Sequence, residues 1–312
     1  MRRFFLIQFI LLVSFYTYAQ KRAAKRAYWS THGLISSTTF LSDLGGKDND
    51  GTNDILDTDF SETRYAIGTG ITFNMTKGFC VGIEAFYGRL SADDAETNWN
   101  RSLRQIHVRT DILETAFKIE YTIPQHGGHL RGMYLNVGGG LIFYKPMAKW
   151  NGNWYNLRPL GTEGQAVDPT KEVYKKYSPV IPFGFGKKIF LKNGLTLALD
   201  VSLRKSFTDY LDDVSTVYYD RDRIQTSSGL AAAHFSDPAN GVGGVGRPGS
   251  TRGFPQNNDN YFLVGFKVHY ILSKQKRGNN YLTVRKNQWL GNRGSTPRFG
   301  RKGRKKRLRL FQ

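Results

Sequence analysis

The chain has 312 residues, enough for one large domain or two small ones, and carries 45 Lys and Arg against 25 Asp and Glu, a formal charge of +20. A mean hydropathy of −0.46, with no apolar run of about 20 residues beyond the N-terminus, excludes a multi-helix membrane protein. The single cysteine excludes a disulfide scaffold and a Cys-based zinc site. The 34 Gly, 21 Phe and 17 Tyr favour an all-β protein with many turns, a class that includes membrane barrels.

The N-terminus has the pattern of an export signal. Arg2 and Arg3 precede an apolar stretch over 4–15, and Ala19 ends a small-residue cleavage motif. We expect residues 1–19 to be removed as a signal peptide. The expected divisions are then a barrel over 20–274 and a C-terminal tail over 275–312.

Eight stretches alternate apolar and polar residues between clusters of Gly, Pro, Asn and Asp, which predicts eight strands. In the seventh, for example, leucines and a valine occupy one face while Thr196, Asp200 and Arg204 lie on the other. The predicted strands lie near residues 28–41, 62–75, 78–91, 107–123, 132–145, 177–189, 193–207 and 260–273.

The strand lengths and connections favour an eight-stranded antiparallel transmembrane β-barrel of the outer-membrane type. Most predicted strands are longer than the usual 5–6 residues of globular sheets and exceed the roughly 9–11 needed to cross a bilayer. The connections alternate between short turns and long loops, the longest covering about 208–259, as bacterial outer-membrane barrels do. A secreted β-sandwich is the alternative fold.

A barrel of eight strands has an interior that side chains fill. The alternation predicts eight inward charges, four of each sign: Glu84, Glu114, Lys118, Glu120, Lys188, Asp200, Arg204 and Lys267. Since buried charges persist only when they are paired, we expect a salt-bridged plug. A charge-lined selective pore is the alternative.

The tail carries most of the charge excess. Residues 275–312 contain 13 of the 45 basic residues and no acid. With both chain ends on the short-turn side, this tail would lie in the periplasm, so we expect no nucleic-acid partner. It is either a solvated tail or a segment that docks on an acidic periplasmic surface. The candidate partner-binding residues are Tyr281, Trp289, Arg298, Arg301, Lys302, Arg304, Lys305, Lys306, Arg307 and Phe311.

The first long loop offers the one candidate metal site. Asp48, Asp50, Asp54 and Asp57 surround Gly51, and carboxylate oxygens at such spacing can wrap a Ca²⁺ ion. The pattern departs from the usual calcium repeat, and an acidic solvated loop is the alternative. No other cofactor is expected.

Three segments resemble the PorG-like outer-membrane proteins of Bacteroidetes, which belong to the type IX secretion and gliding machinery. They are residues 40–46 with Asp43, residues 157–165 with Arg158 and Pro159, and residues 208–216. The last segment, with Asp209, Tyr210, Asp212 and Asp213, is the most specific. The resemblance covers about residues 28–273; Ser42 stands where Gly is expected, and the fourth long loop and the tail are longer than usual.

The resemblance implies a non-catalytic protein of the outer membrane with extracellular loops and a periplasmic C-terminus. Such proteins tether periplasmic ring proteins of the PorK/PorN type to the outer membrane. The motif aspartates would stabilise the rim, bind a partner or simply form turns. The alternatives to a monomeric anchoring subunit are an adhesin-like binding module that uses its surface loops and, third, a lipid A-modifying barrel enzyme.

Overall fold

The computed structural model describes residues 27–42, 44, 61–76, 78–94, 102–124, 128–191, 193–242 and 246–272. The chain divides into two units, Met1–Ser273 and Lys274–Gln312, and all described residues belong to the first. The predicted signal peptide, Asp43, the four aspartates of the calcium prediction and the basic tail lie outside the described residues. Within the described part of the chain, no helix is long and apolar enough to span a membrane.

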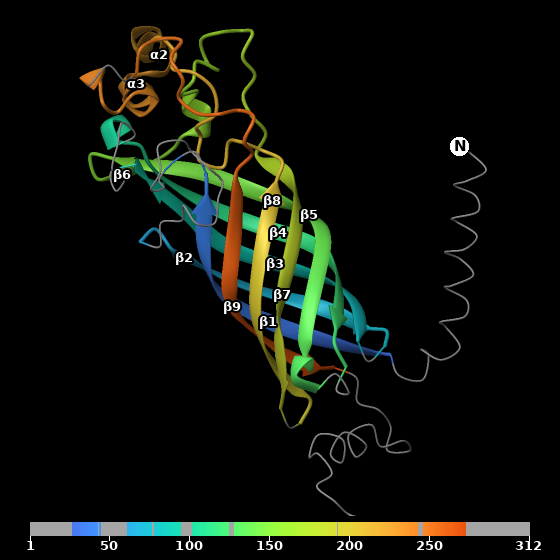
Figure 1. Ribbon diagram of the computed structural model, residues 1–312. Coiled ribbons are helices and arrows are strands. Elements are labelled where there is room, and N and C mark those ends of the chain that lie inside the picture. Colours follow the sequence, from blue (N-terminus) through green and yellow to red (C-terminus); the bar gives the residue numbers. More distant parts are fainter. Residues whose placement is uncertain are drawn as a thin grey trace, which may run out of the picture. The chain divides into compact units, whose positions relative to one another are not determined.

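Nine strands form one antiparallel sheet that closes on itself (Figure 1). Consecutive strands pair except β6 and β7: β6 pairs only with β5, and β7 pairs with β5 instead. β9 pairs with β1, and β4 pairs with β5, so the sheet closes. The predicted eight-stranded barrel is therefore confirmed, with β6 as a short addition to β5. The strands are β1 (Tyr28–Leu41), β2 (Arg64–Asn74), β3 (Phe79–Asp93), β4 (His107–Thr122), β5 (Met133–Trp150), β6 (Asn153–Asn156), β7 (Tyr177–Phe190), β8 (Leu195–Ser206) and β9 (Asn260–Ile271).

The fifth strand differs most from its prediction. It continues five residues past the predicted end at 145 and turns into β6 through Asn151 and Gly152, whose φ angles are 48° and 83°. Asn-Gly with both φ angles positive is the preferred two-residue hairpin turn. The long predicted loop therefore begins with a hairpin that extends the wall beyond the closed barrel.

Both α-helices of the described chain lie in its longest connection. The segment between β8 and β9 contains α2 (Arg221–Ser228) and α3 (Leu230–Ser236), and short 3-10 turns η3 (Ser102–Arg104), η4 (Gly128–Leu130) and η5 (Arg158–Leu160) occur elsewhere. The Asp220 side chain accepts hydrogen bonds from the backbone of Asp222 and Arg223 and so caps α2. Figure 1 places both helices at the long-loop end, near β6, and the short turns at the opposite end.

The barrel is apolar outside. Along β8, Leu195 and Leu199 are exposed whereas Ala198 and Ser202 are fully buried, as the predicted alternation requires. The same inversion runs around the wall and leaves a belt of outward apolar side chains. Its exposed members include Ile35, Ile67, Ile71, Ile83, Leu113, Phe117, Leu135, Val137, Leu141, Ile181, Phe183, Phe185, Leu199, Phe266 and Val268. A soluble sandwich would bury this face.

The interior is layered along the barrel axis. The charged side chains lie in the middle and towards the short turns. Towards the long loops they give way to buried apolar residues, among them Phe86, Leu90, Ile112, Ile142 and Leu263. Side chains fill the narrow interior because glycines make room: a Cβ on Gly186 would lie 2.6 Å from the Tyr134 hydroxyl and 2.0 Å from the Leu199 carbonyl oxygen. The sequence did not predict the apolar layer.

Candidate functional site: the interior network and the loop cap

Glu84 is the centre of the charge network in the barrel. The Lys118 ammonium binds Oε1, and Lys267 Nζ lies 2.8 Å from Oε2. His32 Nε2 lies 3.0 Å from the same Oε2, and Arg204 Nη2 lies 3.5 Å from Oε1. One carboxylate therefore contacts donors from β1, β4, β8 and β9, and joins opposite walls of the barrel.

The remaining inward charges complete the network. Arg204 Nε lies 3.4 Å from Glu114 Oε2, and Lys267 Nζ lies 3.1 Å from Asp200 Oδ1. Closer to the short turns, Lys188 pairs with Glu120. All eight predicted inward charges thus form ion pairs, and the predicted salt-bridged plug is confirmed. Tyr261 adds a 2.6 Å hydrogen bond to Glu114, and Tyr134 donates one to Asp200.

At the long-loop end, residues 157–176, 207–242 and 246–259 fold together into what we call the loop cap. Its centre is Glu163, which is fully buried. Glu163 Oε1 lies 3.0 Å from Arg252 Nη1 and accepts a 2.9 Å hydrogen bond from the Ser215 backbone. Oε2 accepts a 2.7 Å hydrogen bond from the Thr216 hydroxyl. A single carboxylate therefore holds three points of the long β8–β9 segment.

Asp213 forms the second junction of the loop cap. Its side chain accepts a 2.6 Å hydrogen bond from Thr162 and another from the Tyr174 hydroxyl. Its backbone carbonyl accepts one from Arg252 Nη1 at 2.6 Å. Burial raises the pKa of Asp213 to about 6, although Arg252 and the two hydroxyl donors oppose that shift.

Two of the three segments that carry the family resemblance meet in this cap. Arg158 Nε donates a 2.8 Å hydrogen bond to the Tyr174 carbonyl, and Pro159 lies in the first turn of η5. The Tyr174 ring stacks on Tyr210 with centroids 4.4 Å apart. Residues far apart in sequence therefore form one packed unit. Of the third segment, the structure describes residues 40–42 and 44, whereas Asp43 lies outside the described residues.

The motif aspartates have separate roles. Asp212 Oδ1 accepts a 2.9 Å hydrogen bond from the Val214 backbone, which is the predicted turn-forming role. Asp213 has a φ of 65°, a conformation that Asp and Asn tolerate better than most residues, and joins the two segments. Asp209 is buried at the base of the cap. Asp212 and Asp213 therefore stabilise the cap, while partner binding by the motif aspartates stays a prediction.

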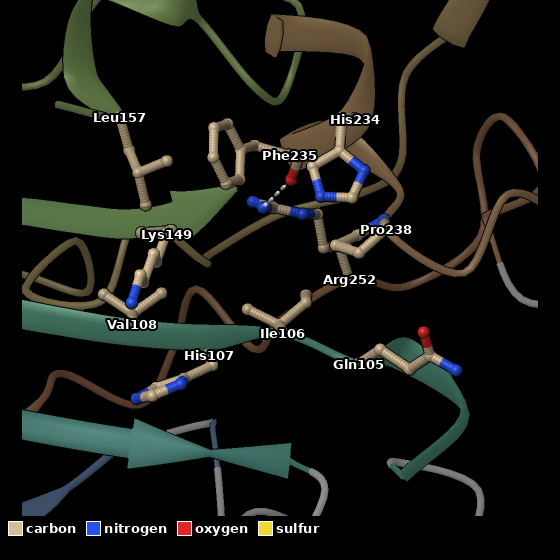
Figure 2. Close-up of a pocket in the computed structure, with 11 residues that line it drawn as sticks. Gln105, Ile106, His107, Val108, Lys149, Leu157, His234, Phe235, Pro238 and Arg252 are labelled. Carbon is tan, nitrogen blue, oxygen red and sulfur yellow. Dashed lines mark hydrogen bonds between the residues drawn. The ribbon is translucent and has the colours of Figure 1, made fainter. Parts of the chain in front are cut away.

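A small cavity lies between the loop cap and the barrel rim (Figure 2). Its volume is about 60 Å³, and Ile106, Val108, Leu157 and Phe235 form its apolar lining. Figure 2 shows the Arg252 guanidinium beside it, donating a 3.2 Å hydrogen bond to the Phe235 carbonyl. The volume suits one or two waters rather than an organic substrate.

Sequence reasoning missed the two residues that matter most in the cap. Glu163 lies inside a motif segment but was not selected, and Arg252 was not selected at all. Their pairing joins positions 89 residues apart, which no local pattern reveals. The described residues contain no group of three or more His, Cys, Asp or Glu placed to hold a metal ion. The calcium prediction falls on residues outside that part of the chain.

Comparisons with known proteins find similarity in fold only. No family model matches the chain, and no curated protein matches it. Among solved structures, it is similar to Ail of Yersinia pestis (5% identity, TM-score 0.37, covering 79% of this chain and 99% of Ail). It is also similar to Neisserial surface protein A (6% identity, TM-score 0.36, covering 78% of this chain and 97% of that protein). A third similar structure is the outer membrane protein AlkL, solved in lipid bilayers (12% identity, TM-score 0.34, covering 81% of this chain and 93% of AlkL).

Proposed function

We propose that this chain is an outer-membrane barrel that anchors a periplasmic assembly rather than conducting or transforming a substrate. The observation that carries the membrane placement is the belt of exposed apolar side chains around a charged interior. In water this arrangement would expose a large apolar surface and bury charge, the opposite of a stable soluble fold. In a bilayer the apolar outer face of the wall contacts lipid, while the charges on its inner face pair with one another.

The anchoring role is supported by the filled interior. The charges inside pair with one another across the barrel. Above them lies the apolar layer, and above that the loop cap, whose charged centre is also paired. A rigid, filled cylinder suits a fixed attachment point in the membrane.

The resemblance to PorG-like proteins indicates which partner the anchor would bind. It implies an attachment to the PorK/PorN-type periplasmic ring of a type IX secretion system. Two of its three segments fold into one buried unit, so these motif residues have a structural role in the cap. We assign the tether to the basic tail, since an acidic periplasmic surface would attract its 13 Lys and Arg.

Copurification tests this assignment. The intact protein and a variant truncated after Lys274 are isolated from the native host, and the bound proteins are identified by mass spectrometry. We expect the truncated barrel to lose the periplasmic ring proteins. Equal recovery with both would place the contact on the short turns, and no ring protein with either would reject the anchoring role.

Two controls separate function from assembly. The truncated barrel must fractionate with the outer membrane and keep the heat-dependent gel migration of a folded barrel. A deletion strain should secrete less protein through the type IX route, whereas its lipid A mass spectrum should stay unchanged. An altered lipid A spectrum would favour the enzyme alternative, and normal secretion with lost surface binding would favour the adhesin.

A further inference from the structure

Outward-facing charges are distributed very unevenly around the barrel wall. Along their full lengths, the neighbouring strands β9, β1 and β2 have no charged residue at an outward position. On the adjoining strands β3, β4 and β5, every outward charge lies at the end of the strand that is next to the long loops. The charges of this sector are Arg89, Asp93, His107, Arg109, Asp111, Lys145 and Lys149.

Positive charge predominates in this sector. The two acids are already engaged: Asp111 Oδ1 lies 2.7 Å from Arg89 Nε, and Asp93 Oδ2 lies 3.6 Å from His107 Nδ1. Arg109, Lys145 and Lys149 form no ion pair with any carboxylate of the described chain, and both lysines are exposed. We call these three residues the basic triad.

The strand register brings the basic triad together. Arg109 on β4 pairs with Met147 on β5, so Lys145 and Lys149 lie two residues to either side of its partner. Such diagonal neighbours lie about 7–8 Å apart and are within reach of long side chains. Three cations therefore surround one patch of the outer wall.

The β5–β6 hairpin fixes one member of the triad. The Arg109 guanidinium carbon lies 3.8 Å from the centroid of the Trp154 ring, a cation–π contact. Trp154 pairs with Lys149 across the hairpin. The hairpin thus continues the wall past the closed barrel and holds Arg109 beside an amphipathic ring, a residue type enriched at membrane interfaces.

The apolar belt begins below the triad. Phe143 is the next outward residue after Lys145, and Leu113 lies two outward positions from Arg109, beyond Asp111. Tyr87 pairs with Leu113, and Tyr177 pairs with Phe143, in the same row. All four side chains are exposed. The sector therefore offers apolar and aromatic surface below and unpaired cations above.

We propose that the basic triad binds the phosphate groups of a lipid headgroup whose acyl chains lie against Leu113 and Phe143. Unpaired Lys and Arg at a bilayer surface attract anionic headgroups, and phosphate accepts charge-assisted hydrogen bonds from both residue types. Ordinary snorkelling of basic side chains would distribute them around the whole rim, whereas β9, β1 and β2 have none. The site thus holds one lipid on one side of the barrel.

This inference rests on the membrane placement proposed above. With the long loops outside, the lipid would be a phosphorylated lipid of the outer leaflet, such as lipid A. Free phosphate shares the headgroup chemistry but lacks the acyl chains that the belt would contact, so the two sources can be distinguished.

Residue-specific footprinting tests the site in the full-length protein. The chain is placed in phosphatidylcholine nanodiscs with or without diphosphorylated lipid A, and lysine acetylation rates are read by peptide mass spectrometry. We expect lipid A to slow acetylation of Lys145 and Lys149 about fivefold. Lys205 is the matched control: it is exposed and outward at the same end, but on β8, and should change less than twofold. The basic tail does not enter this readout.

Further measurements identify which part of the lipid the site recognises. Lipid A stripped of phosphate should give no protection, and inorganic phosphate should neither protect the lysines nor displace lipid A. Arg109→Gln should reduce the protection of both lysines, whereas Lys205→Gln should not. Equal protection of Lys205, protection by dephosphorylated lipid, or protection by inorganic phosphate would each overturn the proposal. A chain that fails to enter nanodiscs would instead reject the membrane placement itself.

Discussion

Two regions of this molecule bury carboxylates among cations, and they do so in different ways. In the barrel, Glu84 contacts four donors from four strands of a closed wall. In the loop cap, Glu163 has one cationic partner, Arg252, and otherwise binds backbone and hydroxyl groups. The barrel positions its strands by ladder hydrogen bonds, whereas the cap depends on its side chains.

The two networks should therefore respond differently to the loss of a charged partner. Removal of one partner of a buried pair leaves an uncompensated charge, which costs several kcal/mol. In the barrel that cost falls on the whole fold, because the wall is one cooperative sheet. In the cap it falls on two loop segments, which can open while the barrel stays folded.

The largest effect should follow removal of the barrel's central carboxylate. Glu84→Ala leaves Lys118 without an ion partner in the described chain, and takes one partner from Lys267 and Arg204. We expect a loss of about 3–5 kcal/mol in the free energy of unfolding. Urea unfolding in detergent micelles, followed by gel migration, measures it.

A double variant provides the control for that measurement. Glu84→Met combined with Lys118→Met removes both charges of the Glu84–Lys118 pair and should cost less than Glu84→Ala alone. A loss below about 1 kcal/mol for Glu84→Ala would mean that the interior charges do not stabilise the barrel.

A smaller and more local effect should follow in the loop cap. Glu163→Gln keeps an acceptor for the Ser215 backbone but removes the charge that faces Arg252. We expect the cap to open about 30-fold more often, equivalent to about 2 kcal/mol. Trypsin cleavage at the arginines of α2 measures this opening, while urea unfolding of the barrel should stay unchanged.

The matched control is Glu172→Gln, an exposed carboxylate on the same loop. It should leave the cleavage rate as it is. Equal cleavage of all three proteins would show that the cap does not depend on the Glu163–Arg252 pair.

The same contrast explains what the sequence could predict. The barrel strands follow from a period of two residues and from turn residues between them, so most of their ends agree with prediction within two residues. The inward charges were predicted with them, since they occupy the polar face. The apolar layer was missed because the alternation reverses at the long-loop ends: the inward residues Leu90 and Ala92 are apolar, whereas Arg89 and Asp93 on the outward face are charged. A rule that places the polar face inside fails there.

The cap was predicted only in part. Its motif residues were selected by resemblance, and the turn role of Asp212 by its residue type. The contacts between segments were not predicted, because Thr162 and Asp213 are 51 residues apart and no periodicity links them. The Asn151-Gly152 hairpin was detectable from turn chemistry alone and was overlooked within a loop.

A pH effect should distinguish the two regions further. The pKa of Asp213 is about 6 in the closed cap and 3.8 in an ordinary carboxyl, so the closed cap binds the proton more tightly. Its stability contribution is complete below pH 4 and is lost as pH rises through 6. Between pH 7 and pH 5 we expect a gain of about 1.3 kcal/mol, seen as roughly tenfold slower trypsin cleavage after correction for trypsin activity on a peptide.

Asp213→Asn is the variant that isolates this carboxyl. Asn tolerates the φ of 65°, and its uncharged amide accepts a hydrogen bond from one of the two hydroxyls and donates one to the other. The difference in cleavage between pH 7 and pH 5 should disappear. Its persistence would assign the pH effect to another group.

The smallest expected effect concerns the hydroxyl that faces Asp213. Tyr174→Phe keeps the ring stacked on Tyr210 at 4.4 Å but removes the hydrogen bond to the carboxylate. Loss of that bond should cost the cap about 0.5–1 kcal/mol near neutral pH. Because the bond favours the ionised carboxyl, its loss raises the pKa of Asp213 further, and the pH midpoint for cap opening should move upward. An unchanged midpoint would mean that Tyr174 acts through packing alone. Unchanged urea unfolding of the barrel in the same sample would show that the effect lies within the cap.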